Sequence, residues 1–408
     1  MQAILSGLRV IDCGTYIAAP AAATILSDFG ADVIKIERPP YGDPYRYLPQ
    51  VAGMPLCDQN YTWILDARNK KSVALDLCDA EARGALLKLI ESADIFITNY
   101  QPQLRRKFAL NYQDLEPLNP RLIYASVTGY GESGEDAEKP GYDATAYWAR
   151  SGLMHSVHNG DAEPVQSPAG FGDHPTSVAL FASIMLALYQ RQITGRGAKV
   201  ATSLVANGVW SHSCAVQAAL CGATFLPKWT RKQAINPFVN HYVASDGRRL
   251  FFCLLEPVTD WPKLCAALGW PQHVVDDTRF CTVDARRVNN VELIAMLDHA
   301  IGKHDLAHWA RVLRQHDLVW GPVPAPWEVA EDPQLEANGV FAEIAPGLKT
   351  VENPINVEGV GKVAPKLAPE VGQHTREVLR AAGYSDDAIG AMVARGAALA
   401  RDGVAASE

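Results

Sequence analysis

Residues 8–37 read LRVIDCGTYIAAPAAATILSDFGADVIKIE, and this stretch decides the fold class. An apolar run (8–13) is followed by an alanine-rich segment (19–30) and a second apolar run (31–37). Short apolar runs without strict alternation are typical of strands that are covered on both faces, and a glycine commonly ends a helix. The pattern predicts a strand, a helix that stops at Gly30 and a parallel strand, which is the repeating unit of a doubly wound α/β domain.

The same theme continues through the first 200 residues. It predicts strands at 71–77, 93–99, 121–129 and 198–205, and helices at 79–92 and 175–192. We therefore expect an α/β fold with a Rossmann-like large domain built on a parallel sheet.

Beyond about residue 206 the pattern changes to that of a smaller α+β domain. It predicts an alanine-rich helical stretch, a hairpin strand and three further helices at 207–222, 246–255, 258–268, 291–316 and 373–396. The expected domains are a large domain (1–205), a linker (206–224), a small domain (225–325) and a segment that returns to the large domain (326–408).

Composition limits the class of protein. The 408 residues are 48% hydrophobic and 20% charged, with a net charge of -8, so the basic surface of a nucleic-acid binder is not expected. No apolar run reaches the roughly 18 residues of a membrane span, and the N-terminus lacks a signal-peptide pattern. The eight cysteines form no C-x-x-C pair, so neither a zinc site nor a disulfide framework is indicated. We expect a reduced, cytoplasmic protein with no metal and no membrane or nucleic-acid partner.

Several familiar cofactor and nucleophile motifs are missing. The first turn reads CGTYIAAP where a dinucleotide site would have G-x-G-x-x-G, and there is no G-x-S-x-G and no Walker A motif. His304 and His308 have helical spacing but lack the glutamate of a zincin. The small residues after the first strand still permit a phosphate to approach the backbone. Arg38 is either a fork for a phosphate or a solvated surface charge.

Polar and aromatic residues stand at the carboxyl ends of the predicted strands. They are Thr15 and Tyr16, Asn99 and Tyr100, and the run from Thr128 to Tyr130. Ligands of open α/β sheets bind at this edge, although loops are polar in general.

The segment GFGDHPTS (170–177) contains the most informative carboxylate, Asp173. Pro175 fits the first position of the following helix, so Asp173 or His174 would cap it. Two interpretations remain open. Asp173 is either an acid that starts a helix, or a reacting group that follows a proline-punctuated loop. A carboxylate at a helix N-terminus is expected to stay ionised at neutral pH.

A set of collinear motifs resembles a known family. They are LRVIDCGTYIAAP, GADVIKIERP, GDPYR, NKKSVALDL, ADIFITNYQP, LNPRLIYASVTGYG, PGYDATAYWARSG, GDHPTS, TGRGAKVATSL, DGRRLFF, GPVPAPWEVAEDPQLEANG and GQHTREVLRAAGYS. Over essentially its whole length the chain resembles the family III CoA transferases (the CaiB/BaiF family), typified by formyl-CoA transferase and the carnitine CoA-transferases.

The resemblance implies a two-domain subunit that interlocks with a second copy as a homodimer. It implies that Asp173 attacks an acyl-CoA thioester and passes through a mixed anhydride and an aspartyl-CoA thioester. Acyl-CoA and a carboxylic acid would be the substrates, with coenzyme A as a substrate and no tightly bound cofactor.

The resemblance also implies a set of coenzyme A contacts. These are Thr15, Tyr16, Ile17, Ala18, Arg38, Leu75, Asn99, Tyr100, Lys107, Lys139 and Tyr142. Two features depart from formyl-CoA transferase: Ile17 replaces a glutamine, and QAINPFVNHY replaces a glycine-rich loop. Lys107 stands where the family often has an arginine. We therefore expect an acceptor other than oxalate.

Alternative functions and substrates follow from the same residues. The α-methylacyl-CoA racemases share the aspartate but carry G-H-D, and this chain has Tyr142 in place of the histidine. A non-catalytic CoA-binding subunit is a further alternative. Tyr147, Trp148 and Arg150 either line a pocket for a dicarboxylic or aromatic acid, with succinyl-CoA as donor, or only pack a helix.

Overall fold

The computed structural model describes residues 3–160 and 162–401. The chain divides into two compact units. The larger unit comprises Met1–Ser156, Gln166–Cys221 and Gly339–Glu408, and the smaller comprises Val157–Val165 and Gly222–Asn338. Contacts thus group residues 326–338 with the smaller unit, whereas the sequence pattern assigned them to the returning segment. The predicted domain boundaries remain a proposal.

A seven-stranded sheet forms the centre of the larger unit, in the order β12-β3-β2-β1-β4-β5-β6. All neighbours pair in parallel except β12, which is antiparallel to β3. The prediction of an α/β fold with a parallel, doubly wound sheet is confirmed. The strands are β1 (Arg9–Cys13), β2 (Asp32–Glu37), β3 (Lys70–Leu75), β4 (Ile95–Thr98), β5 (Ile123–Thr128), β6 (Ala198–Ser203) and β12 (Ala398–Leu399).

Helices cover both faces of this sheet. Those before residue 150 are α1 (Ala18–Asp28), η1 (Pro44–Gln50), α2 (Tyr61–Ala67), α3 (Ala80–Ile90), α4 (Pro102–Phe108), α5 (Tyr112–Leu115) and η2 (Asp143–Ala149). The later ones are α6 (Leu153–Ser156), α7 (Asp173–Thr194), α8 (Leu204–Ser211), α9 (Ser213–Leu220), α17 (Thr375–Ala381) and α18 (Asp386–Ala394). A hairpin, β10 (Phe341–Ala345) and β11 (Leu348–Val351), completes the unit.

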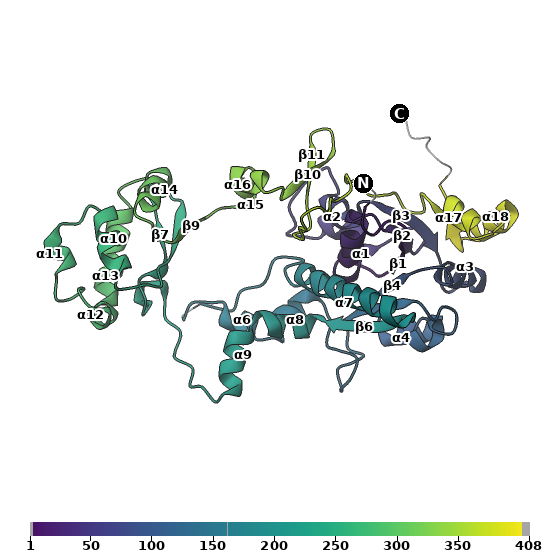
Figure 1. Ribbon diagram of the computed structural model, residues 1–408, viewed down its shortest axis with the longest axis horizontal. Coiled ribbons are helices and arrows are strands. Elements are labelled where there is room, and N and C mark those ends of the chain that lie inside the picture. The colour runs from purple at the N-terminus through teal and green to yellow at the C-terminus, as the bar shows by residue number, and fades with distance from the viewer. Residues whose placement is uncertain (1–2, 161, 402–408) are drawn as a thin grey trace. The chain divides into compact units, whose positions relative to one another are not determined.

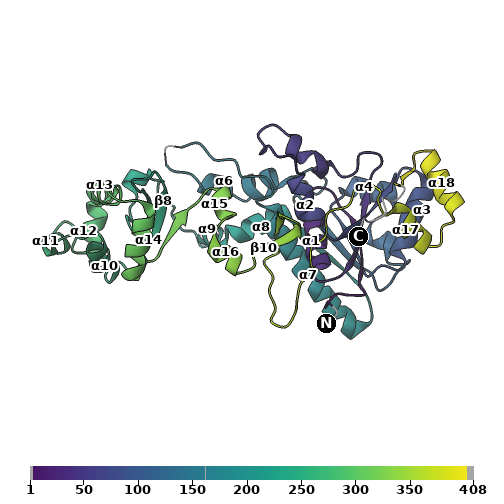
Figure 2. The same ribbon diagram turned by 90° about the horizontal axis from the view of Figure 1, so that it is seen from above.

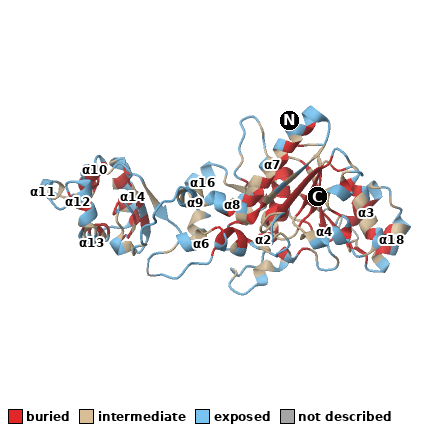
Figure 3. Cartoon of the chain, turned by 90° about the horizontal axis from the view of Figure 1, so that it is seen from below, coloured by how far each residue is buried: buried red, intermediate tan, exposed pale blue. Residues whose placement is uncertain are grey.

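Two apolar clusters hold these layers together. On one face α1 and α7 pack against each other and against the sheet, and α7 runs beside β6 (Figure 1). On the other face α3 and α17 pack on β3, and α18 packs on α17 (Figure 2). The central strands are buried on both sides (Figure 3), which explains why their apolar residues do not alternate strictly with polar ones.

Glycines set several helix ends. Gly30 has a φ of +96° and follows α1 as the sequence predicted. The predicted helix at 373–396 is two helices, because Gly383 adopts a φ of +93° between α17 and α18. The predicted helix at 291–316 is also two helices, α13 (Asn290–Ile301) and α14 (Leu306–Gln315).

The smaller unit has its own core around a three-stranded antiparallel sheet in the order β7-β8-β9. Its strands are β7 (Val239–Val243), β8 (Arg249–Cys253) and β9 (Trp320–Val323). Its helices are η3 (Arg231–Gln233), α10 (Asp260–Ala267), α11 (Gln272–Val275), α12 (Val283–Val288), α13 (Asn290–Ile301), α14 (Leu306–Gln315), α15 (Pro326–Val329) and α16 (Pro333–Ala337).

None of the helices within 3–160 and 162–401 is both long and apolar enough to cross a membrane. The same residues hold no group of three or more His, Cys, Asp or Glu side chains arranged to bind a metal.

Candidate active site

A cavity of about 350 Å³ opens at the carboxyl edge of the sheet, next to the point where the strand order reverses. Strands β1 and β4 are neighbours there. After β1 the chain continues to β2, and after β4 it continues to β5, in opposite directions along the sheet. Asn99 joins the two loops: its side-chain Oδ1 accepts from the N–H of Thr15 at 2.9 Å, and its Nδ2 donates to the carbonyl of Thr15 at 2.7 Å.

Eight of the eleven predicted coenzyme contacts line this cavity together with Asp173. They are Thr15, Tyr16, Ile17, Ala18, Asn99, Tyr100, Lys139 and Tyr142. The other three lie outside its wall. Arg38 is exposed after β2, Leu75 is buried in the core, and Lys107 lies over the ring of Phe108.

A buried group of four charges supports the loop after β1, and the sequence analysis did not find it. Lys35 Nζ lies 2.8 Å from Asp43 Oδ2 and donates to the carbonyl of Gly14. Lys70 Nζ lies 2.9 Å from Asp12 Oδ2 and donates to a backbone carbonyl of α1. Burial alone would lower the pKa of Lys35, but Asp12 and Asp43 hold this pKa above its ordinary value. Lys35 therefore stays charged, whereas burial lowers the pKa of Lys70 below its ordinary value. The contacts of the two lysines hold this loop and the start of α1 in place.

Tyr16 is the strained residue of this loop. Its φ of +60° is uncommon for a bulky residue and costs about 1–3 kcal/mol. Asp43 holds this conformation by accepting from the N–H of Tyr16 at 3.0 Å. The ring of Tyr16 meets that of Tyr142 edge to face, with centroids 5.6 Å apart. The rings of Tyr16 and Tyr142 thus lie together at the cavity.

Asp173 is the first residue of α7, and Gly172 precedes it as the N-cap. The helix therefore begins two residues before Pro175, which the sequence analysis had placed at the first helical position. A side chain at Gly172 has no room, because a Cβ there would lie 2.4 Å from a ring atom of Tyr147. The packing of Gly172 on Tyr147 fixes the start of α7 and hence the position of the Asp173 carboxylate.

The surroundings of Asp173 disfavour its charge. Burial, with the negative charges of Asp143 and Asp66, raises the pKa of Asp173 to about 7, and His174 opposes this shift. The expectation that the helix dipole keeps this group ionised was therefore wrong in degree: the dipole contributes about 1 kcal/mol, less than desolvation. At neutral pH the carboxylate and the acid are both populated.

Asp143 stands on a π-helix, η2, a type of helix that is rare and frequent at functional sites. Its Oδ1 accepts from the N–H of Ala144 at 2.7 Å, and its Oδ2 accepts from the N–H of Gly172 at 3.4 Å. Asp143 thus links the GYD segment to the start of α7.

The three candidate acyl-pocket residues do not line the cavity. Tyr147 and Trp148 are buried, and the hydroxyl of Tyr147 lies 2.7 Å from that of Ser211. Arg150 pairs with Asp136 at 2.8 Å. These contacts favour the helix-packing interpretation.

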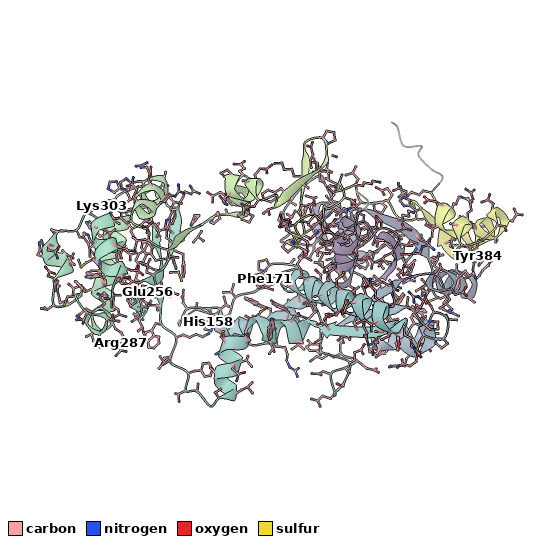
Figure 4. The ribbon with its side chains drawn as sticks, in the orientation of Figure 1. His158, Phe171, Glu256, Arg287, Lys303 and Tyr384 are labelled. Atoms are coloured by element: carbon pink, nitrogen blue, oxygen red, sulfur yellow. The ribbon has the colours of Figure 1, made fainter. Side chains whose placement is uncertain are left out.

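Phe171 is a more exposed aromatic residue near the nucleophile. Phe171 lies two residues before Asp173, just ahead of α7 (Figure 4), and it is 49% exposed. Its ring contacts that of Trp148 edge to face at 5.3 Å.

Comparisons with known proteins agree with this geometry. Residues 5–375 match the family described as CoA-transferase family III. An (R)-2-hydroxy-4-methylpentanoate CoA-transferase of Clostridioides difficile is 33% identical, covering 95% of this chain and 97% of the relative. A cinnamoyl-CoA:phenyllactate CoA-transferase of Clostridium sporogenes is 30% identical over 95% of both chains. The crystal structure of a CaiB/BaiF family protein from Brucella suis superposes with a TM-score of 0.82 at 27% identity, covering 94% of this chain and 100% of the other. The chain therefore belongs to CoA-transferase family III, and it is a CoA-transferase.

Proposed function

We propose that this CoA-transferase works through covalent catalysis at Asp173. The observation that carries the proposal is the position of Asp173. It lies in the wall of the cavity, directly after Gly172, which packs closely against Tyr147. The Asp173 carboxylate attacks the thioester carbonyl of the donor, an anionic tetrahedral intermediate forms, and its collapse breaks the C–S bond. The products of this step are a mixed anhydride and CoA thiolate.

The thiolate then attacks the Asp173 carbonyl, which releases the donor acid and leaves an aspartyl-CoA thioester. The acceptor carboxylate attacks this thioester, and the expelled thiolate attacks the acceptor carbonyl of the new anhydride. Asp173 is regenerated, and no proton is gained or lost in the cycle. Because CoA stays bound, both thiolate attacks are effectively intramolecular, an advantage that reaches about 7–11 kcal/mol.

Coenzyme A would lie along the loops after β1 and β4. The N–H groups around Ile17 and Ala18, at the start of α1, suit a phosphate. Lys139 offers an ammonium group at the cavity wall. Arg38 and Lys107, outside that wall, are proposed for the nucleotide end of the coenzyme.

For the acceptor we favour a carboxylic acid with an apolar side chain, such as a 2-hydroxy acid. The names of the two relatives above and the exposed ring of Phe171 support this choice. Succinyl-CoA is the donor proposed from the sequence, on the idea that Arg150 binds an anion. Because Arg150 pairs with Asp136, apolar acyl-CoA thioesters should be tested as donors beside succinyl-CoA.

A homodimer in the cytoplasm is the proposed form of the protein. Three apolar side chains of α7 support self-association, because Leu186, Tyr189 and Ile193 are 72%, 66% and 70% exposed. Sedimentation velocity would test this, and a monomer at micromolar concentration would contradict it.

The test of the catalytic proposal is trapping. Incubation with an acyl-CoA and hydroxylamine should convert Asp173 to a hydroxamate, which peptide mass spectrometry detects. Asp173→Asn should abolish transfer while CoA binding stays within about threefold. Transfer by this variant at more than a few per cent of the wild-type rate contradicts the proposal. A racemase would instead exchange the α-proton of an unmodified acyl-CoA with deuterated solvent.

A further inference from the structure

The imidazole of His174 is held at both of its nitrogens. Nδ1 lies 3.1 Å from the carbonyl oxygen of Gly170, and Nε2 lies 3.2 Å from Oδ1 of Asp66. A backbone carbonyl can only accept, so Nδ1 carries a hydrogen. The second proton belongs on Nε2, because imidazole is a stronger base than a carboxylate. With both nitrogens protonated, the ring is an imidazolium cation.

Asp66 is itself fixed in place. It lies at the end of α2, is buried, and accepts from the hydroxyl of Tyr45 at 2.6 Å through its other oxygen. Two contacts therefore fix the position of this carboxylate opposite His174.

Other charged groups near His174 have partners of their own. Arg68 and Glu352 line the same cavity of about 430 Å³ as His174 and Asp66. Arg68 pairs with Asp28 at 2.7 Å, and Glu352 pairs with Lys362 at 3.3 Å. On the nucleophile's side, Asp143 faces Asp173.

We propose that His174 is a positioning residue that keeps a fixed positive charge beside Asp173, so that this carboxylate can ionise among two other acids. The inference rests on the proposed role of Asp173 as nucleophile. His174 transfers no proton. The attacking carboxylate and the tetrahedral intermediate carry the same single negative charge, so the cation acts mainly on how much of Asp173 is ionised.

The electrostatics agree with the geometry. Burial alone would lower the pKa of His174, but the hydrogen bond to Asp66 and the charges of Asp66 and Asp173 raise it to about 9. His174 therefore remains a cation over the range in which Asp173 titrates, near pH 7. Since its side chain is 42% exposed, solvent weakens its effect on Asp173, and we expect the lower end of the one to three units typical of a close opposite charge.

The test measures the rate of hydroxylamine trapping at Asp173 against pH. In His174→Gln, which keeps a polar side chain but no charge, the midpoint should rise by about one unit. Trapping should then be about tenfold slower at pH 6 and within about threefold of wild type above pH 9. The KM for the acyl-CoA should stay within about twofold. His273→Gln, at an exposed site of the smaller unit, is the matched control and should leave the midpoint unchanged.

His174→Lys should return the midpoint to within half a unit of wild type, since it restores the charge. An unchanged midpoint in His174→Gln overturns the inference, and so does a shift that persists in His174→Lys, because packing would then be the cause. Hydrogen–deuterium exchange at the imidazole C2 position, followed by mass spectrometry, gives the pKa of His174 in the unmutated protein; a value below 7 also overturns it. Wild-type protein that gives no adduct at Asp173 contradicts the proposed function itself.

Discussion

Replacing Asp173 with asparagine should stabilise the protein at neutral pH while it removes activity. The pKa of Asp173 rises from 3.8 in the unfolded chain to about 7 in the fold. Below pH 3.8 both states hold the proton and ionisation costs nothing. As the pH rises toward 7, the unfolded chain releases a proton that the native state retains, so the free energy of unfolding falls by about 1.4 kcal/mol per pH unit. Above pH 7 both states are ionised, and Asp173 lowers the free energy of unfolding no further.

Asparagine does not titrate, so the variant avoids this loss. From pH 5 to pH 8 the free energy of unfolding of the variant should therefore rise relative to that of wild type by roughly 3 kcal/mol. Partial solvent exposure of the site reduces this change to about 2 kcal/mol. Urea unfolding followed by tryptophan fluorescence at pH 5, 6, 7 and 8 measures this difference. Asp387→Asn, at an exposed site in α18, is the control and should show no such trend. A difference between wild type and Asp173→Asn that stays constant with pH refutes the electrostatic reasoning.

Three further substitutions test the support of the site. Gly172→Ala places a Cβ 2.4 Å from the ring of Tyr147, so we expect a loss of about 1–3 kcal/mol in stability and about a hundredfold in kcat; wild-type turnover would show that the start of α7 is not fixed by this contact. Lys35→Met leaves Asp43 buried without its cation and should lower the free energy of unfolding by about 3–5 kcal/mol; urea titration measures this, and an unchanged free energy of unfolding would mean that the ion pair does not support the fold. Tyr142→Ala removes a ring from the cavity and should weaken CoA binding about tenfold by calorimetry with kcat retained at saturation, whereas a loss of kcat alone would place the ring at the reacting atoms.

The sheet could be predicted from the sequence because its signal is local. Each of these buried strands contains a short apolar segment, and glycines mark where several helices stop. The position of Asp173 at the start of a long helix followed from the proline and the apolar residues behind it. Eight cavity residues could be carried over from the family resemblance because they follow the ends of strands.

The charges around the site could not be predicted in the same way. Lys35 and Asp12 interrupt buried strands, which was a usable signal that charged partners lay nearby. Asp66 gave no such signal, because it meets His174 only through tertiary packing across 108 positions of sequence. The raised pKa of Asp173 depends on burial and on the charges of Asp143 and Asp66, which come near it only through the fold, so a local rule about helix dipoles gave the wrong degree of ionisation.

The transfer of an oxygen atom tests the central claim most directly. The protein is incubated with an unlabelled acyl-CoA and an acceptor acid that carries ¹⁸O in its carboxylate. It is then digested, and the masses of its peptides are measured by mass spectrometry. If Asp173 is the acyl carrier, one ¹⁸O atom enters the peptide that contains Asp173. This atom passes to the released donor acid in any later turnover in which it is the attacking oxygen. If the new thioester accumulates while the Asp173 peptide keeps its natural mass, the acyl group has moved by another route and the account is wrong.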